Sequence, residues 1–226
     1  MTDSPKAIGV ILDGNRRWAK ERGLSSLEGH EAGLKKVNEL VEWSHEAEIA
    51  ELTIYAFSTE NWNRSKEEVE YLMRLFERAF VEQFEKVIER GGRVRFIGDR
   101  ARMPEKLQAM MQDAEERSRN NSDGTLVVAL SYGGRSEILA ATNRLIEQGA
   151  KTIDEESLKG AMWSAGLLDP ELIIRTGGNH RLSNFLTWQS VYSELFFTDT
   201  KWPDFSKEEF TAILADYTSR ERRLGK

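Results

Sequence analysis

The sequence predicts an α/β fold in which a six-stranded, mostly parallel sheet is flanked by helices. The prediction rests on short apolar runs that alternate with longer segments whose apolar residues recur at helical spacing. No linker rich in proline, glycine or serine and no internal repeat interrupts this alternation. At 226 residues the chain is long enough for one sizeable core. We therefore expect residues 1–226 to form a single domain.

Six apolar runs have the length and composition of strands buried in a parallel sheet. They are residues 8–12, 52–57, 94–97, 126–130, 172–174 and Glu194–Phe197. Ligands of open parallel sheets bind beyond the carboxyl ends of the strands, so the residues that follow the strands should converge on one edge. The segments concerned are Asp13 and residues 58–64, 132–135 and 175–183.

Helical spacing of apolar residues predicts six helices, over residues 31–46, 67–90, 104–119, 136–148, 154–165 and 206–218. The helix over residues 67–90 is the longest, at roughly 36 Å. Its aromatic-rich stripe is typical of a core helix, but it also suits the wall of an elongated apolar tunnel. The pattern alone leaves both interpretations open.

Composition excludes several classes of protein. The absence of cysteine excludes disulfides, cysteine-ligated zinc, iron–sulfur clusters and a cysteine nucleophile, and it fits a reducing cytoplasm. The net charge of −6 argues against a dedicated nucleic-acid binder. The first residues lack the apolar stretch of a secretory signal, and no run of 18 apolar residues predicts a membrane-spanning helix. We expect a cytoplasmic protein whose membrane contact, at the inner face, is peripheral.

The segment Asp13-Gly14-Asn15-Arg16-Arg17-Trp18 is the strongest signal for a ligand. It connects the first strand to a helix, so free backbone N–H groups point out of the helix start toward an anion. The glycine permits a close approach, and arginine offers a fork for phosphate oxygens. The aspartate can hold Mg²⁺ between phosphates. This segment therefore predicts an anion site.

A polar loop follows the second strand and contains Ser58, Thr59, Glu60, Asn61, Trp62 and Arg64. Its many donors and its tryptophan suit a pocket that is part polar and part apolar. The same loop also reads as a surface turn that caps the next helix, with Ser65 as the N-cap and Glu68 at the third helical position. The two interpretations are compatible.

A second anion site is predicted around Arg175 and Arg181, which flank a Gly-Gly turn and are followed by Leu182 and Ser183. Two arginines and a hydroxyl can grip a diphosphate, although such a loop can also be paired with nearby acids. His30 opens a helix and either faces the first anion site or serves the scaffold. Glu194 starts an apolar strand, where a carboxylate needs either a metal ion or an arginine partner.

Several familiar site types are missing. The sequence contains no P-loop, no G-x-G-x-x-G, no G-x-S-x-G and no His-x-x-x-His spacing. It also contains no Asp-Asp-x-x-Asp cluster of the helical, aspartate-rich prenyltransferases.

Taken together, the motifs resemble those of the cis-prenyltransferases, and within them the bacterial undecaprenyl diphosphate synthases. The matching stretches occur in the family's order over nearly the whole chain. They are residues 13–19, 29–30, 55–64, 132–135, 175–178, 181–185, Glu194–Phe197, 202–205 and 220–225.

The resemblance implies a six-stranded parallel sheet, a homodimer and a reaction that joins an allylic diphosphate, such as farnesyl diphosphate, to successive isopentenyl diphosphates. The product grows as a cis chain into an apolar tunnel beside the helix over residues 67–90. Long-chain products, undecaprenyl diphosphate above all, serve as precursors of the cell-wall lipid carrier. The apolar product implies transient contact with a membrane.

The resemblance also assigns roles to residues. Asp13 and Glu194 would handle Mg²⁺, Trp18 and Trp62 would flank the prenyl chain, and residues 222–225 would reach the partner subunit's site. The allylic diphosphate would be held by Gly14, Asn15, Arg16, Arg17 and His30. Isopentenyl diphosphate would be bound by Arg175, Arg181 and Ser183. The pocket would be completed by Ser58, Thr59, Glu60, Arg64 and Leu182.

Asn61 occupies the position that the family uses for proton removal. An amide is a poor base, so our hypothesis is that Asn61 orients a proton path toward the leaving diphosphate. Four positions depart from the family pattern. Asn179 replaces a glutamate, Ser26 an arginine, Ser65 a proline and Ser131 an asparagine.

Three rival functions remain to be weighed. A catalytically silent subunit would not need Asp13, Asn61 and Arg175 together in one chain. A phosphate-ester hydrolase would need a nucleophile or a metal-bound water that no Asp/His cluster provides. A carrier of apolar ligands would not need two arginine-rich anion sites. The pattern leaves the product length and the allylic primer open.

Overall fold

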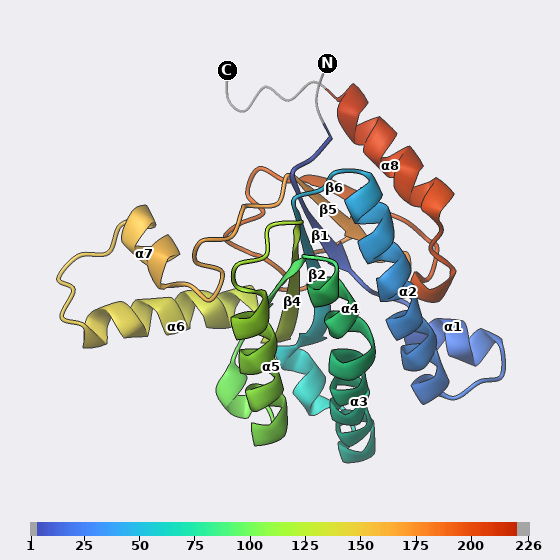
Figure 1. Cartoon of the computed structure of the whole chain (residues 1–226), viewed down its shortest axis with the longest axis horizontal. Coiled ribbons are helices and arrows are strands. Elements are labelled where there is room, and N and C mark those ends of the chain that lie inside the picture. Colours follow the sequence, from blue (N-terminus) through green and yellow to red (C-terminus); the bar gives the residue numbers. More distant parts are fainter. Residues whose placement is uncertain (1–3, 221–226) are drawn as a thin grey trace.

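The computed structural model describes residues 4–220 and places all six predicted strands in one parallel sheet (Figure 1). The strand order is β3-β4-β2-β1-β5-β6, and every neighbouring pair is parallel. The predicted fold class is therefore confirmed. The strands are β1 (Ala7–Ile11), β2 (Glu51–Ser58), β3 (Arg93–Ile97), β4 (Thr125–Tyr132), β5 (Leu172–Arg175) and β6 (Glu194–Phe197).

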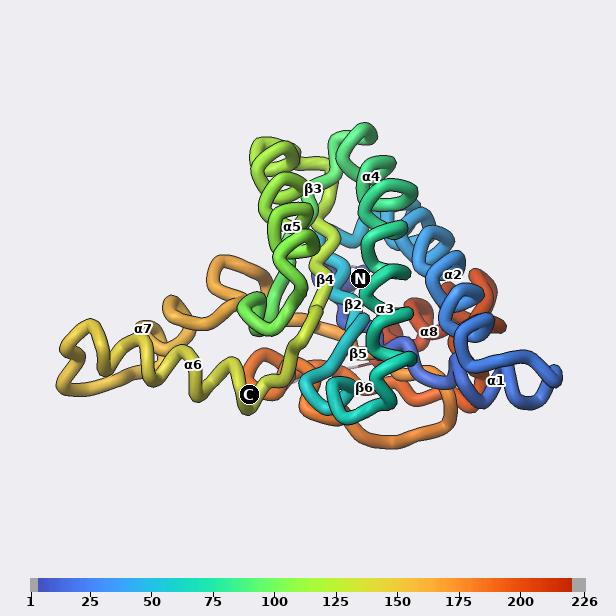
Figure 2. Tube along the Cα trace, turned by 90° about the horizontal axis from the view of Figure 1, so that it is seen from below, coloured from blue at the N-terminus to red at the C-terminus, as the bar shows by residue number. Residues whose placement is uncertain are grey.

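Eight α-helices occur among the described residues. They are α1 (Asn15–Glu21), α2 (Ser26–Glu46), α3 (Lys66–Ala79), α4 (Glu85–Glu89), α5 (Glu105–Ser118), α6 (Gly134–Glu147), α7 (Glu155–Ala161) and α8 (Lys207–Ser219). Both views place α6 and α7 on one side of the molecule and α1 and α2 on the other (Figures 1 and 2). No helix within residues 4–220 is long and apolar enough to cross a membrane.

The main core lies between one face of the sheet and the helices α2, α3, α5 and α8, with Leu40, Phe96 and Leu107 fully buried. A smaller core lies on the other face, where Tyr55 stacks on Phe185 with ring centroids 4.7 Å apart. Here the sheet is covered by an irregular segment that follows β5 rather than by a long helix. That segment contains part of the predicted second anion site.

Two helices differ from the prediction at places that matter for the site. Helix α2 begins at Ser26 because Ser25 and Glu28 form a reciprocal capping box, so His30 lies inside the helix instead of opening it. The predicted helix over residues 67–90 is α3 and α4 joined by a π-helical turn at Phe80–Phe84. Ser65 caps α3 as expected, by accepting a hydrogen bond from the Glu68 N–H.

Candidate active site

The site begins where β1 ends. Gly14 has φ +113°, a left-handed value that glycine adopts without strain, and it turns the chain directly into α1. A side chain at position 14 would also collide with Lys201, since a Cβ there would lie 2.9 Å from the Lys201 Cβ. The turn leaves Asp13 at the carboxyl edge of the sheet.

Asp13 is the centre of the site. Its Oδ2 accepts hydrogen bonds from Arg175 Nη2 at 2.9 Å and from Asn179 Nδ2 at 2.8 Å, while Arg17 Nη2 lies 3.2 Å from Oδ1. Burial alone would raise the pKa of Asp13, but these hydrogen bonds and arginine charges hold the pKa below its ordinary value. Asp13 is therefore ionised at neutral pH.

Arg175 joins the two predicted anion sites. Its side chain is only 5% exposed, and Nη1 donates to Ser183 Oγ at 2.7 Å and to the Arg181 carbonyl while Nη2 binds Asp13. Arg181 is exposed and enters this arrangement through its backbone. The predicted convergence of the segments after β1 and β5 is thus observed at the level of side-chain contacts.

Glu68 is the centre of a second cluster of charged side chains, which includes Arg16 at the start of α1. Its Oε1 lies 3.2 Å from His30 Nε2 and accepts from Arg64 Nη1 at 3.1 Å, and Arg16 Nη1 lies 3.9 Å from Oε2. Burial lowers the pKa of His30 more than Glu68 raises it, so the imidazole is neutral at pH 7. Sequence reasoning missed Glu68 as a site residue, although its i, i+4 spacing from Arg64 was a readable signal.

Two cavities meet at this edge. The larger, about 850 Å³, is lined by Arg16, Arg17, Lys20 and Arg64, and Asp13 is the sole acid among the described residues that line it. The smaller, about 280 Å³, shares Asp13, Asn15, His30 and Arg64 with it and continues between apolar side chains of α2, α3 and the sheet as far as Phe84. We call the first the cationic cradle and the second the apolar channel.

The turn after β2 is a short 3-10 helix, Thr59–Asn63, that brings Asn61 to the apolar channel. Asn61 Oδ1 accepts from the Ser58 N–H at 3.1 Å, which fixes the amide, and both residues line the channel. Glu60 and Leu182 instead line a separate groove of about 250 Å³ beside Asn184. Thr59 lies against Gly133 at the start of α6.

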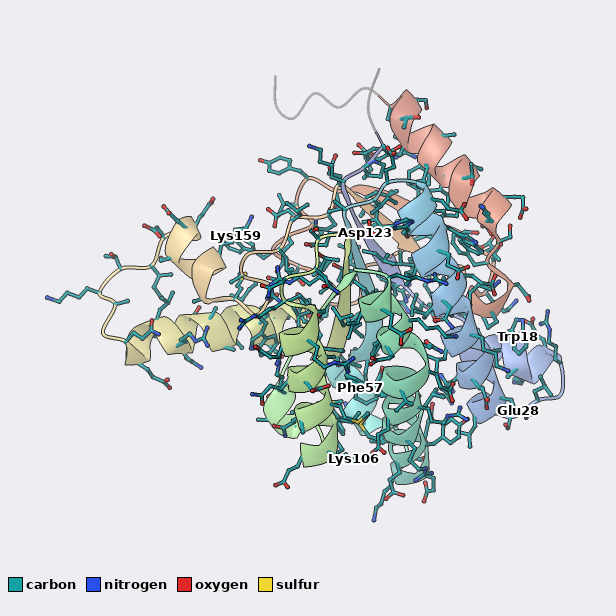
Figure 3. All side chains as sticks on the ribbon, in the orientation of Figure 1. Trp18, Glu28, Phe57, Lys106, Asp123 and Lys159 are labelled. Atoms are coloured by element: carbon teal, nitrogen blue, oxygen red, sulfur yellow. The ribbon has the colours of Figure 1, made fainter. Side chains whose placement is uncertain are left out.

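The two tryptophans lie outside the apolar channel. Trp18 donates from Nε1 to Asp204 Oδ1 at 2.7 Å and stacks with the Arg22 guanidinium, on the α1 side of the molecule (Figure 3). Trp62 donates to Ser131 Oγ at 2.9 Å and lines a groove with Arg102. Neither ring lines the apolar channel, and their role beside a prenyl chain stays a prediction of the resemblance.

Glu194 is also separated from Asp13. It pairs with Leu172 at the amino end of β5, whereas Asp13 follows the carboxyl end of β1, so the two carboxylates lie at opposite edges of the sheet. Arg220 Nη1 donates to Glu194 Oε2 at 2.7 Å. Of the two expectations for Glu194, the arginine partner is the one observed, and a metal site shared with Asp13 does not form within one chain. Residues 222–225 lie outside the described residues.

The donor set at Asp13 fits Mg²⁺ only together with a diphosphate. Within residues 4–220 no group of three or more histidine, cysteine or acidic side chains could hold a metal ion. Mg²⁺ is, however, commonly bound by one or two carboxylates plus substrate phosphates, and it keeps several waters. Asp13, beside a cradle built for phosphate oxygens, meets that requirement.

A cationic cradle that opens into an apolar channel is the arrangement expected of an enzyme that acts on isoprenoid diphosphates. The comparisons agree: the family model described as "Putative undecaprenyl diphosphate synthase" matches residues 11–225. The chain belongs to this family, which confirms the resemblance, and it is a prenyltransferase of the cis-polyprenyl diphosphate synthase type.

Individual relatives cover nearly the whole chain. A "Tritrans,polycis-undecaprenyl-diphosphate synthase (geranylgeranyl-diphosphate specific)" of Pyrococcus abyssi is 45% identical over 98% of this chain and 87% of its own. A "Ditrans,polycis-undecaprenyl-diphosphate synthase ((2E,6E)-farnesyl-diphosphate specific)" of Pseudomonas aeruginosa is 44% identical over 98% and 91%. The crystal structure of lavandulyl diphosphate synthase from Lavandula x intermedia, in complex with dimethylallyl diphosphate, superposes with a TM-score of 0.94 at 34% identity and covers 99% of both chains.

Proposed function

We propose that this enzyme condenses isopentenyl diphosphate onto an allylic diphosphate, with farnesyl diphosphate as the primer, and that the product is undecaprenyl diphosphate for the cell-wall lipid carrier. In each cycle the C1–O bond of the allylic substrate breaks, C1 bonds to C4 of isopentenyl diphosphate, and one proton leaves C2. The observation that carries the proposal is Arg175, which links the cationic cradle through Asp13 to the second anion site at Ser183.

The residues divide the work by charge. Arg16, Arg17 and Arg64 face the cradle and would neutralise the leaving diphosphate, which is where negative charge develops. Mg²⁺, held by Asp13 and the diphosphate, would add further neutralisation of that charge. Arg175 and Ser183 would hold isopentenyl diphosphate beside it, so that the two substrates react as if in one molecule.

Asn61 is proposed to orient the departing proton toward the leaving diphosphate. Its side-chain carbonyl oxygen accepts a hydrogen bond from the Ser58 N–H, which fixes the orientation of the amide. An amide that is held in this way positions a neighbour but does not accept a proton well. Asn61→Asp is expected to lower turnover. A rise in turnover together with a new acidic pKa in the rate profile would refute this role.

The long product is supported by a third cavity, of about 690 Å³, which lies at the amino ends of strands β2 and β4. In Figure 3, Phe57 marks the carboxyl ends of the strands and Asp123, which precedes β4, marks their amino ends. The apolar channel and this distal cavity are lined by residues two apart on the same strand face or three to four apart on the same helix. The channel and distal members of each pair are Ile54 and Leu52, Val128 and Leu126, Val37 and Val41, and Phe84 and Val87.

The volume of the apolar channel also supports growth of the chain toward the distal cavity. The apolar channel alone, at about 280 Å³, is smaller than the pockets of about 300–1,000 Å³ that hold drug-sized ligands. A long prenyl chain therefore needs the space beyond Phe84. We propose that the chain grows along the axis from the channel toward the distal cavity.

We also propose a homodimer and transient membrane contact. Exposed apolar side chains gather on α6 and around the edge strand β6, at Leu139, Ile146, Val191, Tyr192 and Leu195, with Tyr192 77% exposed. An edge strand and an apolar patch are features that proteins usually cover with a partner. The apolar product supports brief contact of the cytoplasmic enzyme with the inner face of the membrane.

The test is incubation of the purified protein with labelled isopentenyl diphosphate, Mg²⁺ and either farnesyl or geranylgeranyl diphosphate, with products resolved by chain length. A farnesyl-primed ladder that ends at undecaprenyl diphosphate is expected, and Asp13→Asn should abolish it. A shorter end-product would refute the proposed product. Preference for geranylgeranyl diphosphate would refute the proposed primer. No Mg²⁺-dependent extension of either primer would favour the silent-subunit alternative.

A further inference from the structure

Three segments that are distant in the sequence meet at Asn184, which follows the second anion site. Its side-chain Nδ2 donates to Glu60 Oε1 at 3.1 Å, and its Oδ1 accepts from the Arg135 N–H at 2.9 Å. Its backbone carbonyl accepts from the Gly134 N–H at 2.7 Å. One residue thus ties the isopentenyl-site loop to the β2 turn and to the start of α6.

The backbone around Asn184 is held in an unusual conformation. Ser183, Asn184 and Leu186 all have positive φ, at +49°, +67° and +43°. Such values are uncommon outside glycine, and they persist only where the surroundings over-determine them, often at functional sites. Phe185, between them, is fully buried in the smaller core, which anchors this loop to the sheet.

The close approach of the three segments depends on Gly133. A Cβ at this position would lie 2.6 Å from Asn184 Nδ2 and 2.7 Å from Thr59 Oγ1, which no relaxed structure permits. The glycine therefore makes room for the amide to reach Glu60. Burial raises the pKa of Glu60, but hydrogen bonds, including that from Asn184, bring the pKa below its ordinary value. The bond is consequently charge-assisted and stronger than a neutral one.

Asn184 and its partner Glu60 both stand next to residues of the proposed reaction. Ser183, the preceding residue, accepts from Arg175 Nη1, and Glu60 directly precedes Asn61. Resting on the proposed function, we propose that Asn184 is a positioning residue that sets the isopentenyl diphosphate loop in register with the Asn61 turn. The bond to Glu60 joins the two loops directly, and the bonds from the Arg135 and Gly134 N–H groups fix Asn184 to the start of α6.

Exchanging the amide and the carboxylate between positions 184 and 60 tests this role. Asn184→Asp removes the donor and places a carboxylate against Glu60, so the KM for isopentenyl diphosphate should rise and kcat fall, by about tenfold in kcat/KM. In the double variant Asn184→Asp with Glu60→Gln, the new amide can donate to the new carboxylate, and most of the loss should be recovered. Asn184→Gly removes both side-chain bonds while tolerating the positive φ, and it should lower kcat/KM by a similar factor.

A matched control separates positioning from ordinary stability. Asn121 also pins a turn, by donating to the Ile88 and Gly92 carbonyls at the opposite edge of the sheet. Asn121→Asp should lower Tm and leave the KM for isopentenyl diphosphate unchanged. Equal KM and kcat in Asn184→Asp and the unaltered enzyme would overturn the inference, as would a double variant no better than Asn184→Asp.

Failure of the proposed function has a different signature. If the unaltered protein extends no primer, that proposal fails, and Asn184 is then judged by calorimetric titration with isopentenyl diphosphate and Mg²⁺. Weaker binding by Asn184→Asp that Glu60→Gln restores would support the positioning role. Equal binding by all variants would refute it.

Discussion

Replacing Asn179 by glutamate would test how the charge at Asp13 is balanced. The Asn179 amide donates to Asp13 Oδ2 at 2.8 Å, sharing that oxygen with Arg175. Asn179→Glu removes a donor to a charged group, which is worth about 1.5–3 kcal/mol. It also brings a second carboxylate to about 4 Å from the first, a repulsion of roughly 4 kcal/mol at an effective dielectric constant of about 20.

The two nearby arginines and the solvent reduce the combined cost of the lost hydrogen bond and the carboxylate repulsion. Arg17 and Arg175 attract the added charge, and both Asp13 and Asn179 are partly exposed. We expect a net loss of about 2 kcal/mol without metal, or a fall in Tm of about 4–8 °C for a chain of this size. The added charge raises the pKa of Asp13 in the folded protein, so the loss should appear as pH rises and vanish below about pH 4.

The assay is thermal unfolding with EDTA and along a Mg²⁺ titration. The matched control is Asn179→Gln, which has the same length as glutamate but keeps the amide. Mg²⁺ should raise the Tm of Asn179→Glu, because two carboxylates can share the ion, and should leave the unaltered protein nearly unchanged. Equal Tm for the glutamate and glutamine variants in EDTA, with equal responses to Mg²⁺, would refute the reasoning.

Three further predictions concern the scaffold and the site. Burial raises the pKa of Glu51 to about 7, so its contribution to stability is lost as pH rises from about 4.5 to 7. Glu51→Gln should therefore stabilise the protein by up to about 3 kcal/mol above pH 7, and a gain in urea unfolding that does not change with pH would contradict this cause. Gly33→Ala should lower the free energy of unfolding, measured in urea, by about 1–2 kcal/mol, because its Cβ would overlap Asn15 Oδ1 and lie 2.9 Å from Trp202 Cδ1. An unchanged free energy of unfolding would show that α2 can shift. Arg175→Lys should lower the elongation rate at least about tenfold, since one ammonium cannot replace a buried fork that binds Asp13, Ser183 and the Arg181 carbonyl; near-normal rates would exclude this bridging role.

The convergence of the site was predictable because parallel strands carry their carboxyl ends to one edge. Asp13 follows β1 and Arg175 ends the neighbouring strand β5, and the sequence pattern was sufficient to bring them together. The same rule, applied strictly, places Glu194 at the other edge, because it begins its strand rather than following it. The capping box at Ser25 and Glu28 was likewise readable, and it gives the earlier start of α2.

The directions of side chains and the volumes of cavities could not be predicted from the sequence. Trp18 lies on a helix next to the cradle, yet its indole turns toward Asp204, a partner 186 residues away in the chain. Glu68 was visible as a helix-capping residue, but its contacts with His30 and Arg16 depend on how α1, α2 and α3 pack together. The same packing determines the room beyond Phe84, which no apolar stripe reveals.

The π-helical turn at Phe80–Phe84 lets the wall of the apolar channel carry one residue more than an unbroken α-helix would hold. Each α-helical residue advances the helix by about 100°, so an extra residue in an α-helix would turn everything after it by that angle. The wide turn absorbs the extra residue, and Val87 stays on the face that lines the distal cavity. Deleting one residue within the turn should therefore restore an uninterrupted α-helix and keep Val87 on that face, whereas deleting Lys86 from α4 should turn Val87 away. On the proposed function, chain-length control would tolerate a change of residue count inside this turn but not directly after it.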